Sequence, residues 1–125
     1  MEILIIILLV ANLLLTFLLW QSQTQQKKDV QEILENTAKV LKANNMVVDI
    51  NTGTEHRYPI KEITPYPDFM EMVKKYDIPV ILSSDAHYPE HVGYKIKEAG
   101  EYAKSFGINE SVMFDKRKRK FVEIG

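Results

Sequence analysis

The chain opens with a long apolar segment. Residues 3–20 are almost entirely hydrophobic, and only Asn12 and Thr16 interrupt the run. A helix over this segment would be roughly 27 Å long, close to the ~30 Å thickness of the hydrocarbon core of a bilayer. Trp20 stands at the end of the run, where an aromatic side chain would meet the membrane surface. The pattern predicts a transmembrane helix over residues 1–21 that attaches the protein to a membrane through residues 3–20.

A cleaved signal peptide is the main alternative for this segment. Signal peptides begin with a basic stretch and end at a cleavage site flanked by small residues. Here only Glu2 precedes the apolar run after the initial methionine, and the polar sequence Gln21–Thr24 follows it. An uncleaved anchor is therefore favoured. Because Lys27 and Lys28 follow the span, the positive-inside rule predicts that the C-terminal part lies in the cytoplasm. A cytoplasmic protein without membrane attachment is the alternative location.

Beyond the apolar segment the pattern becomes that of a folded domain. Residues 22–28 are polar and predict a linker or the start of a helix, and residues 29–125 form the predicted domain. From Asp29 the apolar residues recur with the period of an α-helix, and Asn44–Asn45 ends this pattern. The predicted apolar face consists of Val30, Ile33, Leu34, Ala38 and Leu41.

Two further helices are expected to begin at prolines, because proline suits the first turn of a helix. The first begins near Pro67, and the second begins at Pro89 and ends at Gly107, a natural C-cap. Their apolar residues are Phe69, Met72, Val73 and Tyr76 in the first helix, and Val92, Ile96, Ala99, Ala103 and Phe106 in the second.

Short apolar runs between these helices predict strands. They cover residues 46–51 and 78–82, and two β-rich runs at 111–114 and 121–124 close the chain. Alternation of helices and strands favours an α/β fold with parallel strands and helical crossovers. A closed (β/α) barrel normally needs about 250 residues. The folded part has room for only two or three βα units, so we expect it to be a piece of something larger.

The candidate chemistry begins at the end of the second strand. The sequence Ser83–His87 follows the apolar run directly, so Asp85 and His87 come just after the carboxyl end of a strand. Functional residues of α/β folds lie at that end. Two residues that are two apart in extended backbone point to the same side, so this pair could bind one divalent metal. The alternative is structural, with Asp85 capping the loop and His87 making an ordinary hydrogen bond.

A second polar segment, Asp49–Gly53, ends the first strand. Asp49 and Asn51 would again face one side, and the Asn51 amide can both donate and accept hydrogen bonds. Gly53 would let a ligand approach the backbone closely. Asn, Thr and Gly are also common where a strand runs into a turn, and this plainer interpretation is favoured on local grounds.

Three segments in this order resemble motifs of the PHP (polymerase and histidinol phosphatase) family. Asp49–Gly53 resembles the E-x-N-T-[SAG]-G segment of PHP-type histidinol phosphatases, and Lys61–Phe69 resembles their K-E-x-Y-P-S-P-D-[FIL] segment. Ser83–His87, followed by Pro89 and Val92–Gly93, resembles G-S-D-A-H-x-P-x-x-V-G. The resemblance runs from about residue 30 to the end of the chain.

The resemblance implies a fold and a chemistry. The family forms a distorted (β/α)₇ barrel whose strand ends bind a cluster of divalent metals (Zn, Mn or Fe). The resemblance therefore implies that this chain forms a partial (β/α) barrel of two or three βα units. It hydrolyses phosphate monoesters, in this case L-histidinol phosphate of histidine biosynthesis, with the metals polarising the phosphoryl group and supplying a hydroxide nucleophile. Asp85 and His87 match the last metal-ligand motif of the family, and Asn51 matches a position near the substrate pocket.

The chain also departs from the family pattern. The opening H-x-H motif and the middle His and Glu ligands are absent, and Asp49 stands where the family has Glu. His56 is a candidate additional ligand, whereas His91 is expected near a helix start, in solvent. Two hypotheses follow. The chain is either a histidinol phosphatase completed by a second chain that supplies the rest of the barrel, or a catalytically inactive, membrane-anchored remnant or binding protein.

Composition narrows the partners. The net charge is −1, so no overall attraction to nucleic acid is expected. The absence of cysteine excludes disulfides and thiolate metal sites. The basic tract Lys116–Lys120 could contact phosphates or anionic lipid, but a solvated hairpin turn whose lysines discourage strand pairing is favoured. The apolar segment predicts a membrane partner, and the family resemblance implies a small phosphorylated substrate.

Overall fold

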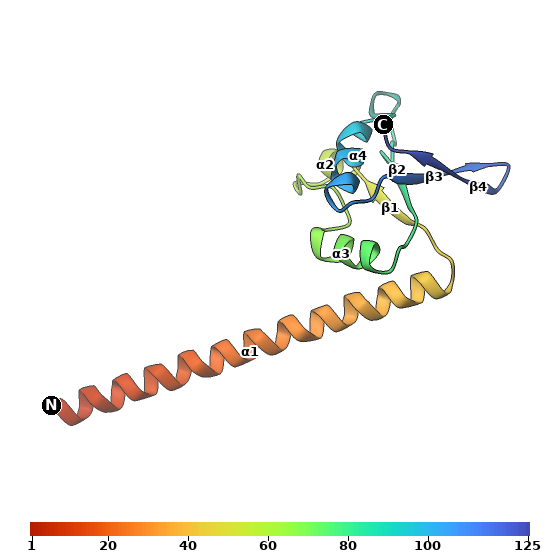
Figure 1. Cartoon of the computed structure of the whole chain (residues 1–125). Coiled ribbons are helices and arrows are strands. Elements are labelled where there is room, and N and C mark those ends of the chain that lie inside the picture. Colours follow the sequence, from red (N-terminus) through yellow and green to blue (C-terminus); the bar gives the residue numbers. More distant parts are fainter. The chain divides into compact units, whose positions relative to one another are not determined.

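The structure is a computed structural model that describes all residues from 1 to 125. The chain divides into two compact units, Met1–Ile33 and Leu34–Gly125. Apart from Met1, the first unit is helical and belongs to α1, which runs without a break from Glu2 to Ala43 (Figure 1). Residues 22–28, predicted as a linker or a helix start, are therefore helical. No Pro or Gly occurs before Gly53, so nothing in this stretch interrupts the helix.

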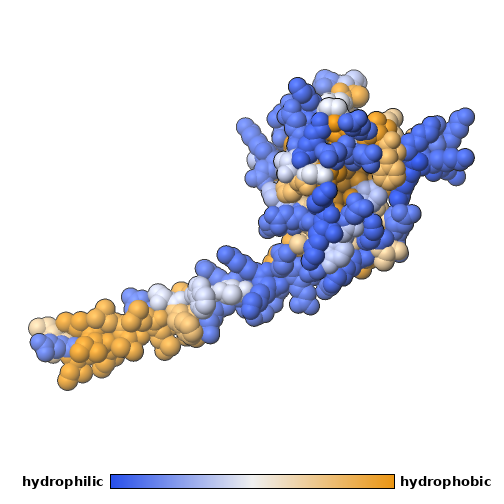
Figure 2. Space-filling view, in the orientation of Figure 1, coloured by the Kyte–Doolittle hydropathy of each residue, from blue (hydrophilic) through white to orange (hydrophobic).

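The apolar segment covers the N-terminal half of α1. Its side chains are exposed, and Figure 2 shows them as a continuous hydrophobic surface at that end of the helix. The helix is long and apolar enough to cross a membrane, a measure that a signal sequence or a core helix of a soluble protein also meets. The membrane location and the orientation remain predictions.

The second unit is organised around a parallel pair of strands, β1 (Val48–Asn51) and β2 (Val80–Ser83). Val48 pairs with Val80 and Asn51 with Ser83, so the two carboxyl ends lie side by side. The crossover between them contains α2 (Thr54–Arg57) and α3 (Pro67–Lys75). The predicted parallel pairing with a helical crossover is confirmed for these two strands, and both lie within or close to the predicted limits.

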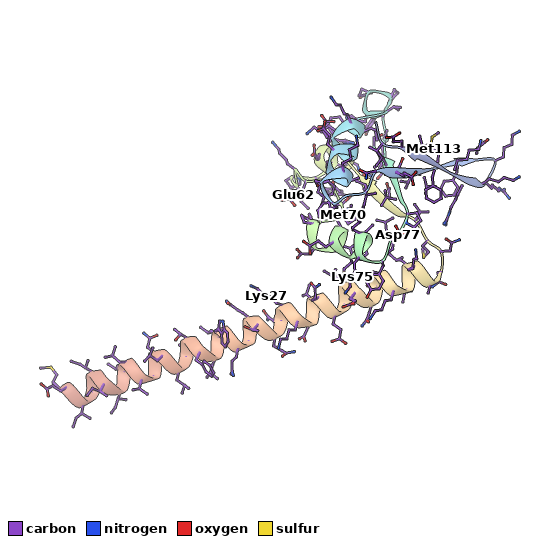
Figure 3. The ribbon with its side chains drawn as sticks, viewed as in Figure 1. Lys27, Glu62, Met70, Lys75, Asp77 and Met113 are labelled. Carbon is purple, nitrogen blue, oxygen red and sulfur yellow. The ribbon has the colours of Figure 1, made fainter.

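Helices bury the apolar side chains of this strand pair. Pro67 lies in the first turn of α3 as predicted, and Met70 on this helix (Figure 3) is fully buried together with Val73. Met70 was not among the predicted apolar residues, whereas the predicted Phe69 and Tyr76 are only partly buried. The apolar face predicted near the end of α1 is only partly buried. Leu34, Ala38 and Leu41 pack against the core, while Val30 and Ile33 are exposed.

The helix predicted from Pro89 is wrong in its first part. Pro89–His91 forms a single 3₁₀ turn, labelled η1, and the α-helix α4 begins only at Ile96 and ends at Ser105. Gly93 and Lys95 have φ angles of +77° and +50°, which interrupt a right-handed helix. Gly107, with φ of +76°, follows α4 in the left-handed conformation expected of a residue that ends a helix.

The last two strands depart from the parallel pattern. The strands β3 (Glu110–Asp115) and β4 (Lys118–Glu123) pair antiparallel in a sheet of their own. Lys116 and Arg117 form the two-residue turn between them, both with positive φ, a geometry that suits a tight hairpin. The hairpin predicted for the basic tract is thus confirmed. The strands form two separate pairs and no closed barrel, so the partial barrel stays a prediction.

A carboxylate joins α1 to α3 inside the second unit. Glu35 Oε1 accepts hydrogen bonds from Lys75 Nζ at 2.8 Å and from the Tyr76 hydroxyl at 2.5 Å, and Lys75 projects from α3 toward α1 (Figure 3). The Lys75 bond first, and then the Tyr76 bond, lower the pKa of Glu35 from its usual 4.5 to about 2. The ionised carboxylate therefore favours the folded state.

Replacing Ile50 by Ala should destabilise the second unit by about 2–5 kcal/mol, because the side chain is completely buried at the centre of β1. Chemical denaturation followed by circular dichroism measures this change. Ile60→Ala removes the same atoms from a side chain that is 45% exposed and should change the free energy of unfolding by less than about 0.5 kcal/mol. Equal effects of the two substitutions would contradict the assignment of the core.

Glu35→Gln should lower the free energy of unfolding at pH 7, and the difference from the wild type should shrink as the pH falls from 4.5 toward 2. The sign follows because a depressed carboxyl pKa stabilises the fold above the unfolded pKa and loses this effect on protonation. Denaturation series at several pH values measure the difference. Glu101→Gln, at an exposed carboxylate of α4, is the control and should show no such pH dependence.

Candidate functional site

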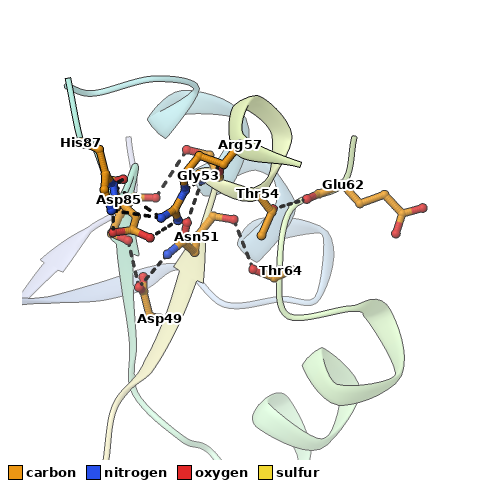
Figure 4. A network of polar contacts seen from close by, with 11 residues as sticks. Asp49, Asn51, Gly53, Thr54, Arg57, Glu62, Thr64, Asp85 and His87 are labelled. Carbon is orange, nitrogen blue, oxygen red and sulfur yellow. Dashed lines mark hydrogen bonds and ion pairs between the residues drawn. The ribbon is translucent and has the colours of Figure 1, made fainter. Parts of the chain in front are cut away.

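The polar side chains that follow β1 and β2 gather at one edge of the strand pair (Figure 4). The register that pairs Asn51 with Ser83 brings the two chain segments together at their carboxyl ends. Asp49 and Asn51 come from β1, whereas Asp85 and His87 come from the loop after β2. The two segments singled out in the sequence therefore form a single site.

The Asp49 side chain joins the two strands. Its Oδ2 atom accepts a hydrogen bond from Ser83 Oγ at 2.9 Å and another from Asn51 Nδ2 at 3.2 Å. The Asn51 Oδ1 atom in turn accepts a bond from the Gly53 backbone N–H at 2.7 Å. Asp49 and Asn51 thus face the same side, as predicted. All these bonds of the Asn51 amide are made within the protein. The substrate-binding role of Asn51 therefore remains a prediction.

Sequence reasoning missed Arg57, which lies at the centre of the site. This residue ends α2, and its guanidinium forms an ion pair with the Asp85 carboxylate through Nη2 and Oδ2. Its Nη1 atom lies 3.3 Å and 3.4 Å from the two ring nitrogens of His87. The sequence offers only a weak signal for Arg57. It follows the Asn51–Gly53 turn by four residues and belongs to none of the motifs described above.

The loop after β2 holds Asp85 and His87 close to each other. Asp85 has a φ of +46°, a left-handed conformation that Asp tolerates better than most residues. His87 Nδ1 lies 2.9 Å from the Asp85 backbone oxygen and 4.0 Å from its Oδ1 atom. The side chains of Asp85, His87 and Arg57 are 42%, 56% and 27% exposed. A small ligand in solvent can therefore reach all three.

Arg57 sets the charge state of Asp85. The hydrogen bond from its guanidinium lowers the pKa of Asp85 below the usual 3.8, and the charges of Arg57 and His87 add to this effect against a smaller opposing effect of burial. Asp85 therefore stays ionised to a lower pH than an ordinary aspartate. The site as a whole presents a carboxylate, an imidazole and a guanidinium, which suit proton transfer and anion binding.

The donors at this edge do not fit a divalent metal as they are arranged. Among residues 1–125, no group of three or more His, Asp or Glu side chains is placed to hold a metal ion. Asp85 and His87 supply two donors, and the Arg57 cation lies against both of them. Two donors are fewer than the four ligands that zinc normally takes or the six that a hard cation takes, so water would have to fill the remaining positions. The metal role of Asp85 and His87 remains a prediction from the family resemblance.

The other two histidines form a separate cluster. The rings of His56 and His91 stack with their centroids 4.0 Å apart, and the Tyr94 ring lies nearly perpendicular to that of His56 with the centroids 5.1 Å apart. Both nitrogens of His56 are shielded from solvent and lack a hydrogen-bond partner in the chain, as does Nδ1 of His91. The expectation that His91 lies in solvent is wrong, because η1 carries its ring onto α2. The structure places His56 in this stack, and its role as an additional ligand stays a prediction.

Comparison with known proteins supports a phosphatase likeness. A protein from Deinococcus radiodurans, described as a probable histidinol-phosphatase, is 33% identical over 79 residues. The match covers 63% of this chain and 30% of that relative, so the chain spans less than a third of the length of the relative. No protein-family model matches the chain. The likeness agrees with the resemblance carried by the three sequence motifs.

Arg57→Ala should raise the pKa of Asp85 toward 3.8, because the guanidinium that stabilises the carboxylate is removed. An NMR titration of the Asp85 side-chain carboxyl carbon measures the shift. Arg119→Ala is the matched control, since Arg119 lies on β4 and contacts Asn45 instead. A pKa of Asp85 that stays unchanged in Arg57→Ala would show that the ion pair does not form in solution.

Proposed function

We propose that the second unit binds phosphate monoesters at the carboxyl ends of β1 and β2, as part of a phosphatase site of the histidinol-phosphatase type. The observation that carries this proposal is the position of Arg57 between Asp85 and His87. The partial likeness to a probable histidinol-phosphatase supports it, as do the three sequence motifs.

Arg57 is the residue that would bind the phosphoryl group. A guanidinium offers several N–H donors in a planar fork that matches phosphate oxygens. In Arg57 the Nη2 atom is engaged by Asp85, while Nη1 has only the ring of His87 nearby. A phosphate group that approached from solvent would find the Nη1 side of the fork and the His87 ring. Because the Asp85 carboxylate repels a phosphate dianion at the same place, we expect this chain alone to bind phosphate weakly.

Hydrolysis would require more ligands than these residues supply. In the proposed complete site, Asp85 and His87 would contribute to binding a divalent metal (Zn, Mn or Fe), and L-histidinol phosphate would be the substrate. A second polypeptide would supply the remaining ligands. The second candidate is a binding protein without catalytic activity, and the small number of donors at the site favours it.

We also propose that α1 anchors this site to a membrane through residues 3–20, with the second unit in the cytoplasm. The length and apolar surface of the N-terminal half of α1 support the span. Lys27 and Lys28 at its C-terminal side support the orientation.

The full chain in detergent micelles should bind L-histidinol phosphate, and Arg57→Ala should weaken this binding about 10- to 100-fold, as expected for the loss of a charged hydrogen bond. Isothermal titration calorimetry, with and without Mn²⁺, measures the dissociation constant. Arg57→Lys keeps the charge without the fork and should fall between the two, whereas Arg119→Ala should bind like the wild type.

A phosphate-release assay on the same samples separates the two candidate functions. Mn²⁺- or Zn²⁺-dependent turnover that Asp85→Asn or His87→Ala abolishes would establish catalysis by this chain. Binding without turnover would favour the non-catalytic function. Equal affinities of the wild type and Arg57→Ala would contradict the proposed phosphate site.

A further inference from the structure

The polar interruptions of the apolar segment lie on one side of α1. Asn12, Thr16 and Leu19 are separated by steps of four and three residues, which place them in one row along a helix. The same stepping continues through Gln23 and Gln26 to Val30 and Ile33, still within the first unit. We call this row of seven residues the Asn12 seam. Steps of three and four residues are the spacing by which helices pair along their length.

Asn12 has no partner within the chain. Its side chain is exposed, and its amide makes no hydrogen bond to any other residue, whereas the Thr16 hydroxyl donates to the Leu13 backbone oxygen at 2.8 Å. An amide that enters hydrocarbon without a hydrogen-bond partner costs free energy, on the order of a few kcal/mol. In a membrane the Asn12 amide therefore favours any arrangement that gives it a donor and an acceptor.

The seam changes character beyond the apolar segment. From Gln21 onward α1 is mostly polar, yet Val30 and Ile33 are apolar and are 52% and 63% exposed. These two residues continue the row that Asn12 begins. One side of the helix thus carries two polar residues in its apolar half, Asn12 and Thr16, and two apolar residues in its polar half, Val30 and Ile33. Both pairs suit contact with another helix along this side.

We propose that a second copy of this chain pairs with α1 along the Asn12 seam, with the two helices parallel in the membrane. Copies inserted in one orientation place their Asn12 residues at the same depth. An amide is self-complementary, since it donates and accepts, so the two Asn12 side chains can bond to each other. The Val30 and Ile33 side chains of the two copies then cover each other outside the hydrocarbon. This proposal rests on the proposed membrane span and is independent of the phosphate site.

The absence of cysteine makes the pairing directly testable by cross-linking. Full-length chains with a single cysteine, Val30→Cys or Ile33→Cys, would be oxidised in native membranes and analysed for disulfide-linked dimers. Both should cross-link, because equivalent seam residues of parallel helices face each other. Gln31→Cys is the matched control. It lies about 100° around the helix from Val30 and should give few dimers. Equal dimer yields at Gln31 and Ile33 would overturn the proposal.

The role of Asn12 requires a second pair of variants, made in the Ile33→Cys background. Asn12→Leu removes the amide and should weaken dimerisation about 3- to 30-fold, the range measured for hydrogen bonds between membrane helices. Asn12→Leu combined with Leu14→Asn keeps the composition but moves the amide about 200° around the helix, and it should also lose the Ile33 cross-link. Unchanged cross-linking in both variants would show that Asn12 does not hold the pair together.

Alkaline extraction of the same membranes separates failure of the pairing from failure of the anchor. A chain that stays in the membrane pellet but does not cross-link at Val30 or Ile33 would overturn the pairing and leave the anchor standing. A chain released into the soluble fraction would overturn both.

Discussion

The parallel pairing of β1 with β2 is the constraint on which the second unit depends. Each strand is only four residues long, so its position is determined by what packs over it. Ile50 and Val80 are buried by apolar residues of α3 and α4. A shift of one residue in the register would turn these side chains toward solvent. It would also separate Asn51 from Ser83, and the two loops that carry the polar site would no longer meet.

The polar site depends on that register and on the Arg57 guanidinium. Without Arg57, Asp85 and His87 would be a carboxylate and an imidazole on a surface loop, joined by the contact of His87 Nδ1 with the Asp85 backbone oxygen. The guanidinium connects this loop to α2, and through Gly53 to the end of β1. The guanidinium thereby neutralises the charge of Asp85 within the chain. A ligand must compete with this internal pairing, which links the stability of the site to its affinity for anions.

Much of this architecture could be predicted from local patterns. The two apolar runs gave the parallel strands, Pro67 marked the start of α3, and Gly107 the end of α4. Predictions failed where distant segments meet. The helix expected at Pro89 begins seven residues later because Gly93 and Lys95 adopt left-handed conformations. Arg57 and the His56–His91 stack belong to no local pattern, since their partners lie some thirty residues away along the chain.

The left-handed backbone of Asp85 limits how this position can change over evolutionary time. Gly, Asn and Asp adopt such a conformation at lower cost than most other residues. If the carboxylate were no longer needed, Asp85 would therefore be replaced by Gly or Asn more readily than by another residue. Asn in particular would preserve the shape of the loop while removing its negative charge. Among relatives of this chain, the residue at position 85 can thus serve as a record of whether selection has acted on the charge or only on the turn.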